Sequence, residues 1–138
     1  MTPLFFITGI GTDVGKTLAA AIVAKALQAD YWKPIQAGFE HGTDSSLVKD
    51  WLAGTDNVIH PEVYRLQMPA SPHIAARQEG ISISLNQVKN SLQQILSGPH
   101  SKNGIVIEGA GGLMVPLNEK EFVADLAQQL QAKVIQDF

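Results

Sequence analysis

The sequence predicts an α/β fold of three layers, in which helices cover both faces of a mostly parallel sheet. Short apolar runs alternate along the chain with helix-forming segments, and glycine-rich stretches follow two of these runs. Strands that alternate with helices are joined by right-handed crossovers, which make neighbouring strands parallel. The 138 residues are expected to form one domain, residues 1–138.

Each expected strand is a short apolar run bounded by glycine or proline. These runs are residues 4–8, 30–35, 104–108 and 132–135. Helices are expected where alanine and leucine predominate or where apolar residues recur at helical spacing. They cover residues 17–29, 45–52, 85–96 and 122–130, with a short helical turn from Ser71–Pro72 to Gly80. Ligands of such a sheet bind at the carboxyl ends of its strands.

Composition and charge exclude several classes of protein. Hydrophobic residues make up 45% and charged residues 17%, which is typical of a globular chain. The net charge of −3 gives no basic surface for nucleic acid, and no segment approaches the ~18 apolar residues of a membrane span. Cysteine is absent, which excludes disulfides and thiolate metal sites. We therefore expect a cytoplasmic protein without nucleic-acid or membrane partners.

The stretch GIGTDVGKT, residues 9–17, is typical of a phosphate-binding loop between a strand and a helix. Its backbone N–H groups would surround an anion, while Lys16 would reach the outer phosphates and Thr17 would bind Mg²⁺. The usual pattern has four residues between its first glycine and Gly-Lys-Ser/Thr, whereas Gly9 leaves five. The alternative is a glycine-rich turn capped by Thr17. The motif favours nucleotide binding in a P-loop NTPase-like fold.

Lys33 and Glu108 stand at the ends of the second and third expected strands. A lysine beside a proline is usually a solvated surface charge, but this one lies at the ligand-binding edge of the sheet. Glu108 is placed to hold Mg²⁺ directly or through water; the alternative is an acid that caps a helix or orders a loop. Small residues at 109–112 indicate close approach of the backbone to a ligand. We expect Lys16 and Glu108 to face the same terminal phosphoryl group.

Asp44 is expected to cap the N-terminus of a helix, and the residues alone indicate no metal role for it. The histidines lack the spacing of metal ligands, and His73 is assigned no catalytic role. Both tryptophans are expected to be packing residues. These residues are His41, His60, His73, His100, Trp32 and Trp51.

With these motifs in order, the sequence resembles the dethiobiotin synthetases, enzymes of biotin synthesis. The resemblance includes the five-residue form of the phosphate loop that begins at Gly9 and continues through further stretches in the family's order. These are WKPIQAG (32–38), TDSSL (43–47), SPHIAA (71–76), EGAGGLMVPL (108–117) and FVADLAQQL (122–130). The resemblance implies a cytoplasmic homodimer that closes the ureido ring from 7,8-diaminopelargonate, CO₂ and ATP with Mg²⁺.

The resemblance also implies roles for individual residues. ATP would be bound by Gly9, Asp13, Val14, Gly15, Lys16, Thr17, Leu18, Asp44, Glu108, Gly109, Ala110 and Gly111. The magnesium ligands would be Thr17, Asp44 and Glu108. Lys16 and Lys33 would be catalytic. The substrate would contact Thr12, Lys33 and Ala37.

The sequence departs from the family in two respects. Ala37 stands where the family commonly has a serine or threonine that contacts the substrate. The family is also longer, so we expect this chain to hold the N-terminal catalytic part without the C-terminal portion, with weak or absent catalysis unless a partner chain supplies the rest. The alternatives are a nucleotide-binding fragment and a partitioning-type P-loop ATPase switch, whose early loop lysine is missing at positions 10–12.

Overall fold

The computed structural model describes residues 1–9 and 13–137. Within these ranges the main sheet has five parallel strands, in the order β4-β2-β6-β1-β7. Their bounds are β1 Leu4–Gly9, β2 Asp30–Trp32, β4 Ile59–His60, β6 Ile105–Glu108 and β7 Lys133–Asp137. The predicted parallel sheet is confirmed.

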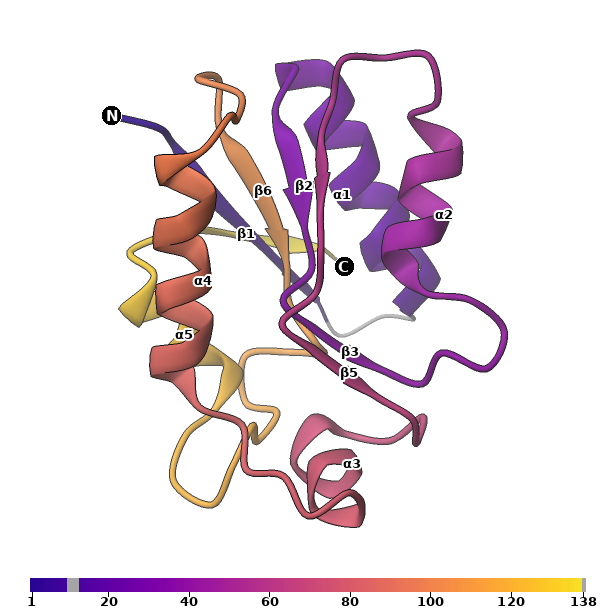
Figure 1. Cartoon of the computed structure of the whole chain (residues 1–138), viewed down its shortest axis with the longest axis vertical. Coiled ribbons are helices and arrows are strands. Elements are labelled where there is room, and N and C mark those ends of the chain that lie inside the picture. Colours follow the sequence, from indigo (N-terminus) through magenta and orange to yellow (C-terminus); the bar gives the residue numbers. More distant parts are fainter. Residues whose placement is uncertain (10–12, 138) are drawn as a thin grey trace.

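A second, smaller sheet corrects the predicted strand pattern. It pairs β3 (Ile35–Ala37) with β5 (Tyr64–Leu66) in parallel, below the main sheet in Figure 1. The predicted strand 30–35 is therefore wrong as one element, because the chain leaves the main sheet at Lys33 and Pro34. Proline has no N–H for the ladder, and the Pro34 carbonyl accepts hydrogen bonds from the start of β5 instead. The short strands β4 and β5 were not predicted.

Helices lie on both faces of the main sheet (Figure 1). Helices α1 (Asp13–Leu27) and α2 (Asp44–Trp51) cover one face, and α4 (Leu85–Ser97) and α5 (Val123–Gln129) cover the other. Helix α3 (Pro72–Gln78) packs beside the smaller sheet. This arrangement confirms the predicted three-layer α/β fold. Helix α1 begins four residues earlier than predicted, so Lys16 and Thr17 lie inside it.

Alternate residues of the strands supply two hydrophobic clusters, one on each face of the sheet. Phe6 and Ile107 pack with α4 and α5, whereas Ile7 and Val106 pack with α1 and α2. Trp32 is fully buried, as expected of a packing residue, whereas Trp51 is 40% exposed at the end of α2. None of the helices in the described ranges has the length and apolar character needed to span a bilayer.

Candidate functional site

The carboxylate of Glu108, at the end of β6, is fully buried at the centre of a polar cluster. Its Oε1 accepts a hydrogen bond from the Tyr31 hydroxyl at 2.6 Å. Its Oε2 accepts from the Thr17 hydroxyl at 2.9 Å and from Lys33 Nζ at 3.1 Å. Lys33 Nζ also forms an ion pair with Asp44 Oδ2 at 2.6 Å. We call these five residues the carboxylate cluster.

The register of the parallel strands brings the cluster together. Tyr31 on β2 lies opposite Val106 on β6, so their side chains point to the same face of the sheet. Glu108 follows Val106 by two residues and shares that face, which α1 covers with Thr17. Lys33, directly after β2, extends its ammonium group to the same carboxylate. The hydrogen bond from Thr17 joins the helix of the phosphate loop to the end of β6.

Burial and charge together set the protonation of the cluster. Burial lowers the pKa of Lys33, but attraction to Glu108 and Asp44 and hydrogen bonds to both outweigh it, so that pKa is raised. For Glu108, burial is the main reason that the pKa is raised, and the positive charge of Lys33 opposes that rise. Burial and the Glu108 carboxylate raise the pKa of Tyr31 well above its ordinary value, so its hydroxyl remains a donor. One buried ammonium thus faces two carboxylates, and the cluster attracts further positive charge.

Asp44 is held toward Lys33 by its position at the start of α2. The predicted cap at Asp44 is wrong, because the N-cap is Thr43, whose hydroxyl oxygen accepts a hydrogen bond from Ser46 N at 3.1 Å. Asp44 is the next residue, and its backbone N–H donates to Gln36 Oε1 at 3.1 Å. Its carboxylate therefore has no capping role and is available to Lys33. Gln36 was not predicted as a site residue.

The three residues expected to hold magnesium all belong to the carboxylate cluster. Carboxylate and hydroxyl oxygens are the ligands that Mg²⁺ prefers, and a hydroxyl that donates to Glu108, as Thr17 does, can still offer its oxygen to a cation. The described residues contain no group of three or more His, Asp or Glu side chains arranged around a metal position. A magnesium ion at Asp44 and Glu108 would therefore depend on water and nucleotide oxygens as well, and would compete with Lys33 for the carboxylates.

The other residues expected to bind ATP lie at the end of β1 and in the first turns of α1. Gly9 ends the strand, and Asp13, Val14, Gly15, Lys16, Thr17 and Leu18 open the helix. Lys16 is buried, whereas Leu18 is 46% exposed. The alternative that Thr17 caps the helix is wrong, because α1 begins at Asp13. Thr12, the expected substrate contact, lies outside the described residues.

Two of the small residues after Glu108, Gly109 and Gly111, are required by packing inside the protein. A Cβ atom added at Gly109 would lie 2.7 Å from Cε1 of the buried Phe6 ring. One added at Gly111, where φ is +100°, would lie 2.8 Å from Val115 Cγ2. Neighbouring side chains therefore require glycine at these two positions, and the close approach of a ligand to residues 109–112 stays a prediction.

This packing predicts that Gly109→Ala destabilises the fold by about 1–3 kcal/mol, because the added methyl group forces the Phe6 ring to shift. Urea denaturation should show the loss. Gly98→Ala is the matched control, since its added Cβ would meet Gln94 O at 3.6 Å and Ile95 O at 3.8 Å, both ordinary contacts. A change within about 0.5 kcal/mol is expected there. Equal stability of the two variants would contradict the packing explanation.

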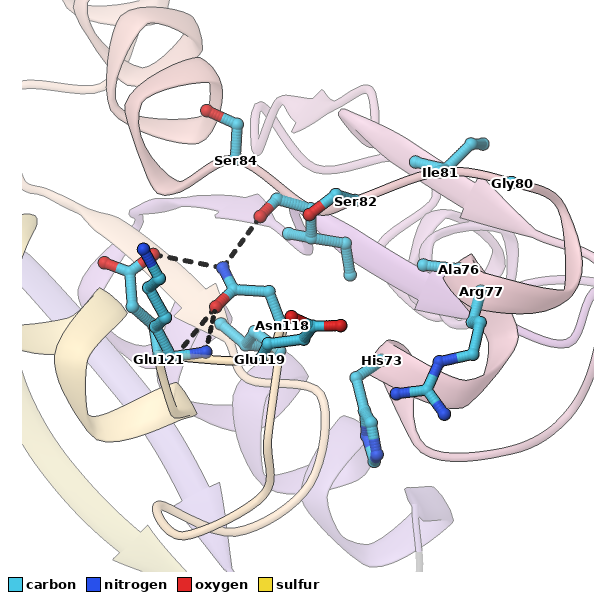
Figure 2. A pocket seen from close by; sticks show the side chains of 13 residues that line it. His73, Ala76, Arg77, Gly80, Ile81, Ser82, Ser84, Asn118, Glu119 and Glu121 are labelled. Atoms are coloured by element: carbon cyan, nitrogen blue, oxygen red, sulfur yellow. Dashed lines mark hydrogen bonds between the residues drawn. The ribbon is translucent and has the colours of Figure 1, made fainter.

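A cavity of about 650 Å³ lies away from the carboxylate cluster, between α3 and the segment 117–121. Figure 2 shows His73 and Arg77 of α3 on one side and Asn118 and Glu121 on the other. Asn118 Nδ2 donates to Glu121 Oε1 at 3.0 Å within the segment 117–121 and to Ile83 O at 2.9 Å, which joins this segment to the chain that follows α3. None of the residues expected to bind ATP, magnesium or substrate lines this cavity.

A protein-family model described as an AAA domain matches residues 4–135. The chain belongs to this family. The match covers every strand of the main sheet and every helix, apart from the last two residues of β7.

Curated relatives make the resemblance more specific. The chain is 49% identical to the ATP-dependent dethiobiotin synthetase BioD of Cytophaga hutchinsonii over 95% of its length, which is 60% of that relative. It is 50% identical to the same enzyme of Christiangramia forsetii over 91% of its length, or 57% of that relative. For the Rhodopseudomonas palustris enzyme the identity is 44%, over 98% of this chain and 61% of the relative. The predicted resemblance is confirmed, and the chain spans about 60% of the length of these relatives.

Proposed function

We propose that the chain is the Mg²⁺–ATP-binding and catalytic part of a dethiobiotin synthetase, an ATP-dependent cyclo-ligase acting on 7,8-diaminopelargonate and CO₂. The observation that carries the proposal is the buried ammonium of Lys33 between Asp44 and Glu108, with Thr17 of the phosphate-loop helix bound to the same Glu108. The names of the curated relatives support it. A cytoplasmic homodimer, as in the resembled family, is part of the proposal.

The reaction brings anionic groups together, and Lys16, Lys33 and a magnesium ion held at the carboxylate cluster would supply the opposite charge. One amine of the substrate takes up CO₂ as a carbamate, whose oxygen attacks the γ-phosphorus while ADP leaves. The second amine then attacks the carbamate carbon, and phosphate leaves as the ring closes. Carbamate and triphosphate repel each other, and Lys16 and Lys33 would offset that repulsion in a site with little water.

Each residue contributes a separate effect in this proposal. Lys16, buried in the first turns of α1, would contact the outer phosphates, together with the positive end of the helix dipole. Thr17, Asp44 and Glu108 would hold magnesium, which shields the charge of the γ-phosphate when it is bound. Lys33 would orient the carbamate for attack. Ala37 has no hydroxyl, so only its backbone would contact the substrate.

Calorimetry with Mg²⁺–ATP tests the nucleotide site directly. The chain should bind Mg²⁺–ATP, and Lys16→Ala should weaken binding by about tenfold to a hundredfold, the effect of losing a charged hydrogen bond. Lys25→Ala is the matched control, because Lys25 is exposed in the last turn of the same helix. Equal affinity of both variants for Mg²⁺–ATP would rule out the proposed phosphate contact.

A second assay tests the reaction. The chain is incubated with bicarbonate, ATP and the diamine, and dethiobiotin is detected by mass spectrometry while calorimetry measures diamine binding. Product that requires both ATP and diamine would support the proposed function. Binding of Mg²⁺–ATP without any binding of the diamine would favour a nucleotide-binding fragment instead.

A further inference from the structure

We infer that Tyr31 is a positioning residue of this site, whose hydroxyl fixes the Glu108 carboxylate so that its second oxygen faces Thr17 and Lys33. The inference rests on the proposed function, because it assigns Tyr31 a part in presenting Glu108 to a magnesium-bound nucleotide. No motif in the sequence indicates such a role for a tyrosine in the middle of a strand.

The two oxygens of Glu108 have different partners. Oε1 accepts a hydrogen bond from Tyr31 Oη at 2.6 Å, while Oε2 accepts from Thr17 Oγ1 and Lys33 Nζ. The terminal torsion of a glutamate side chain is broad when nothing restrains it. With one oxygen bound to Tyr31, the carboxylate has a single orientation, and the other oxygen is turned to the helix of the phosphate loop.

Tyr31 itself is held rigidly. Its side chain is fully buried in the cluster that contains Ile7 and Val106, and its backbone N–H donates to Val58 O at 2.9 Å. A phenylalanine would fill the same apolar space, so the packing alone does not require a hydroxyl. A buried hydroxyl is costly without a partner, and the partner here is the Glu108 carboxylate.

The matched pair of variants is Tyr31→Phe and Tyr64→Phe. Each variant removes one buried phenolic hydroxyl that donates a hydrogen bond. The Tyr31 hydroxyl donates to Glu108 Oε1, and the Tyr64 hydroxyl donates to Gln87 Oε1 at 2.9 Å. The Tyr64 hydroxyl also accepts from Ser84 N at 2.9 Å, and Tyr64 lies in the smaller sheet, outside the carboxylate cluster. Both variants are therefore destabilised, but only Tyr31→Phe changes the surroundings of Glu108.

The readout is the magnesium dependence of ATP binding, measured by calorimetry at several Mg²⁺ concentrations. Tyr31→Phe should raise the Mg²⁺ concentration needed for half-maximal binding by about tenfold, the usual effect of losing a partner of a metal ligand. Affinity for ATP in EDTA should change less than twofold. Tyr64→Phe should leave both quantities unchanged. Thermal melting in EDTA confirms that each variant is folded.

A double variant tests whether the effect acts through Glu108. In the Glu108→Gln background, Tyr31→Phe should no longer change the magnesium dependence. Tyr31→Phe with the magnesium dependence of the unmodified chain would overturn the inference and leave the proposed function intact. Failure of the unmodified chain to bind Mg²⁺–ATP would overturn both the inference and the proposed function. The two failures are therefore distinguishable.

Discussion

Lys33→Ala is expected to abolish ring closure and to destabilise the fold by about 3–5 kcal/mol, while Mg²⁺–ATP binding is largely retained. Removing one partner of a buried ion pair leaves the other charge uncompensated, and here two carboxylates, Asp44 and Glu108, lose the same ammonium. Dethiobiotin formation, calorimetry with Mg²⁺–ATP and urea denaturation measure the three effects. Mg²⁺ restores positive charge between the carboxylates, so it should raise the melting temperature of the variant more than that of the unmodified chain.

The same ion pair predicts how stability depends on pH. The pKa of Lys33 in the folded chain lies above the ordinary value of 10.5, so the folded state holds this proton more tightly than the unfolded state. Its stabilising contribution is therefore complete below pH 10.5 and is lost as the pH rises through the folded pKa. Lys33→Ala should be less sensitive than the unmodified chain to a change from about pH 9 to about pH 11.

Lys49→Ala is the matched control for Lys33→Ala. Lys49 is an exposed lysine in the last turn of α2, so its removal should change stability by less than about 0.5 kcal/mol. Loss of nucleotide binding in Lys33→Ala would contradict the role in ring closure assigned to Lys33. Unchanged stability of that variant would contradict the buried ion pair.

The fold was largely predictable because its signals are local. A buried parallel strand is a short apolar run, and the runs that became β1, β2, β6 and β7 stand out in the sequence. Strands β4 and β5, of two and three residues, are too short to show a pattern. Pro34 gave a usable signal for the split between β2 and β3, since proline ends a ladder, but nothing local shows that the chain continues into a second sheet.

The candidate site was only partly predictable, for a different physical reason. Lys16 and Thr17 belong to the glycine-rich stretch that follows the first strand, and Glu108 ends a strand just before a second such stretch. These positions alone indicate a ligand site. Tyr31 lies within a strand, where an aromatic residue normally indicates packing. Its contact with Glu108 depends on the register between β2 and β6, which the sequence does not contain locally. Gln36 depends in the same way on a contact across a loop.

Glu108→Gln is expected to abolish most of the magnesium dependence of ATP binding and to destabilise the fold by about 3 kcal/mol. Glutamine keeps the size of the side chain and one oxygen that can accept from Tyr31. Its amide group, however, replaces the oxygen that accepts from Thr17 and Lys33. A donor would then face the Lys33 ammonium, and a magnesium ion would lose one of its two carboxylates. Calorimetry with ATP in Mg²⁺ and in EDTA, together with urea denaturation, measures both effects.

Glu119→Gln provides the comparison, because it makes the same chemical change at an exposed position outside the carboxylate cluster. It should leave stability and magnesium dependence unchanged. If Glu108→Gln were to lose stability but keep the full magnesium dependence, Glu108 would serve only to neutralise Lys33, and the metal would have to be held by Asp44, Thr17 and the nucleotide. If Glu108→Gln were to keep both its stability and its magnesium dependence, the hydrogen bonds that converge on Glu108 would contribute nothing to the fold or the site. The proposed function would then lose the contact on which it rests.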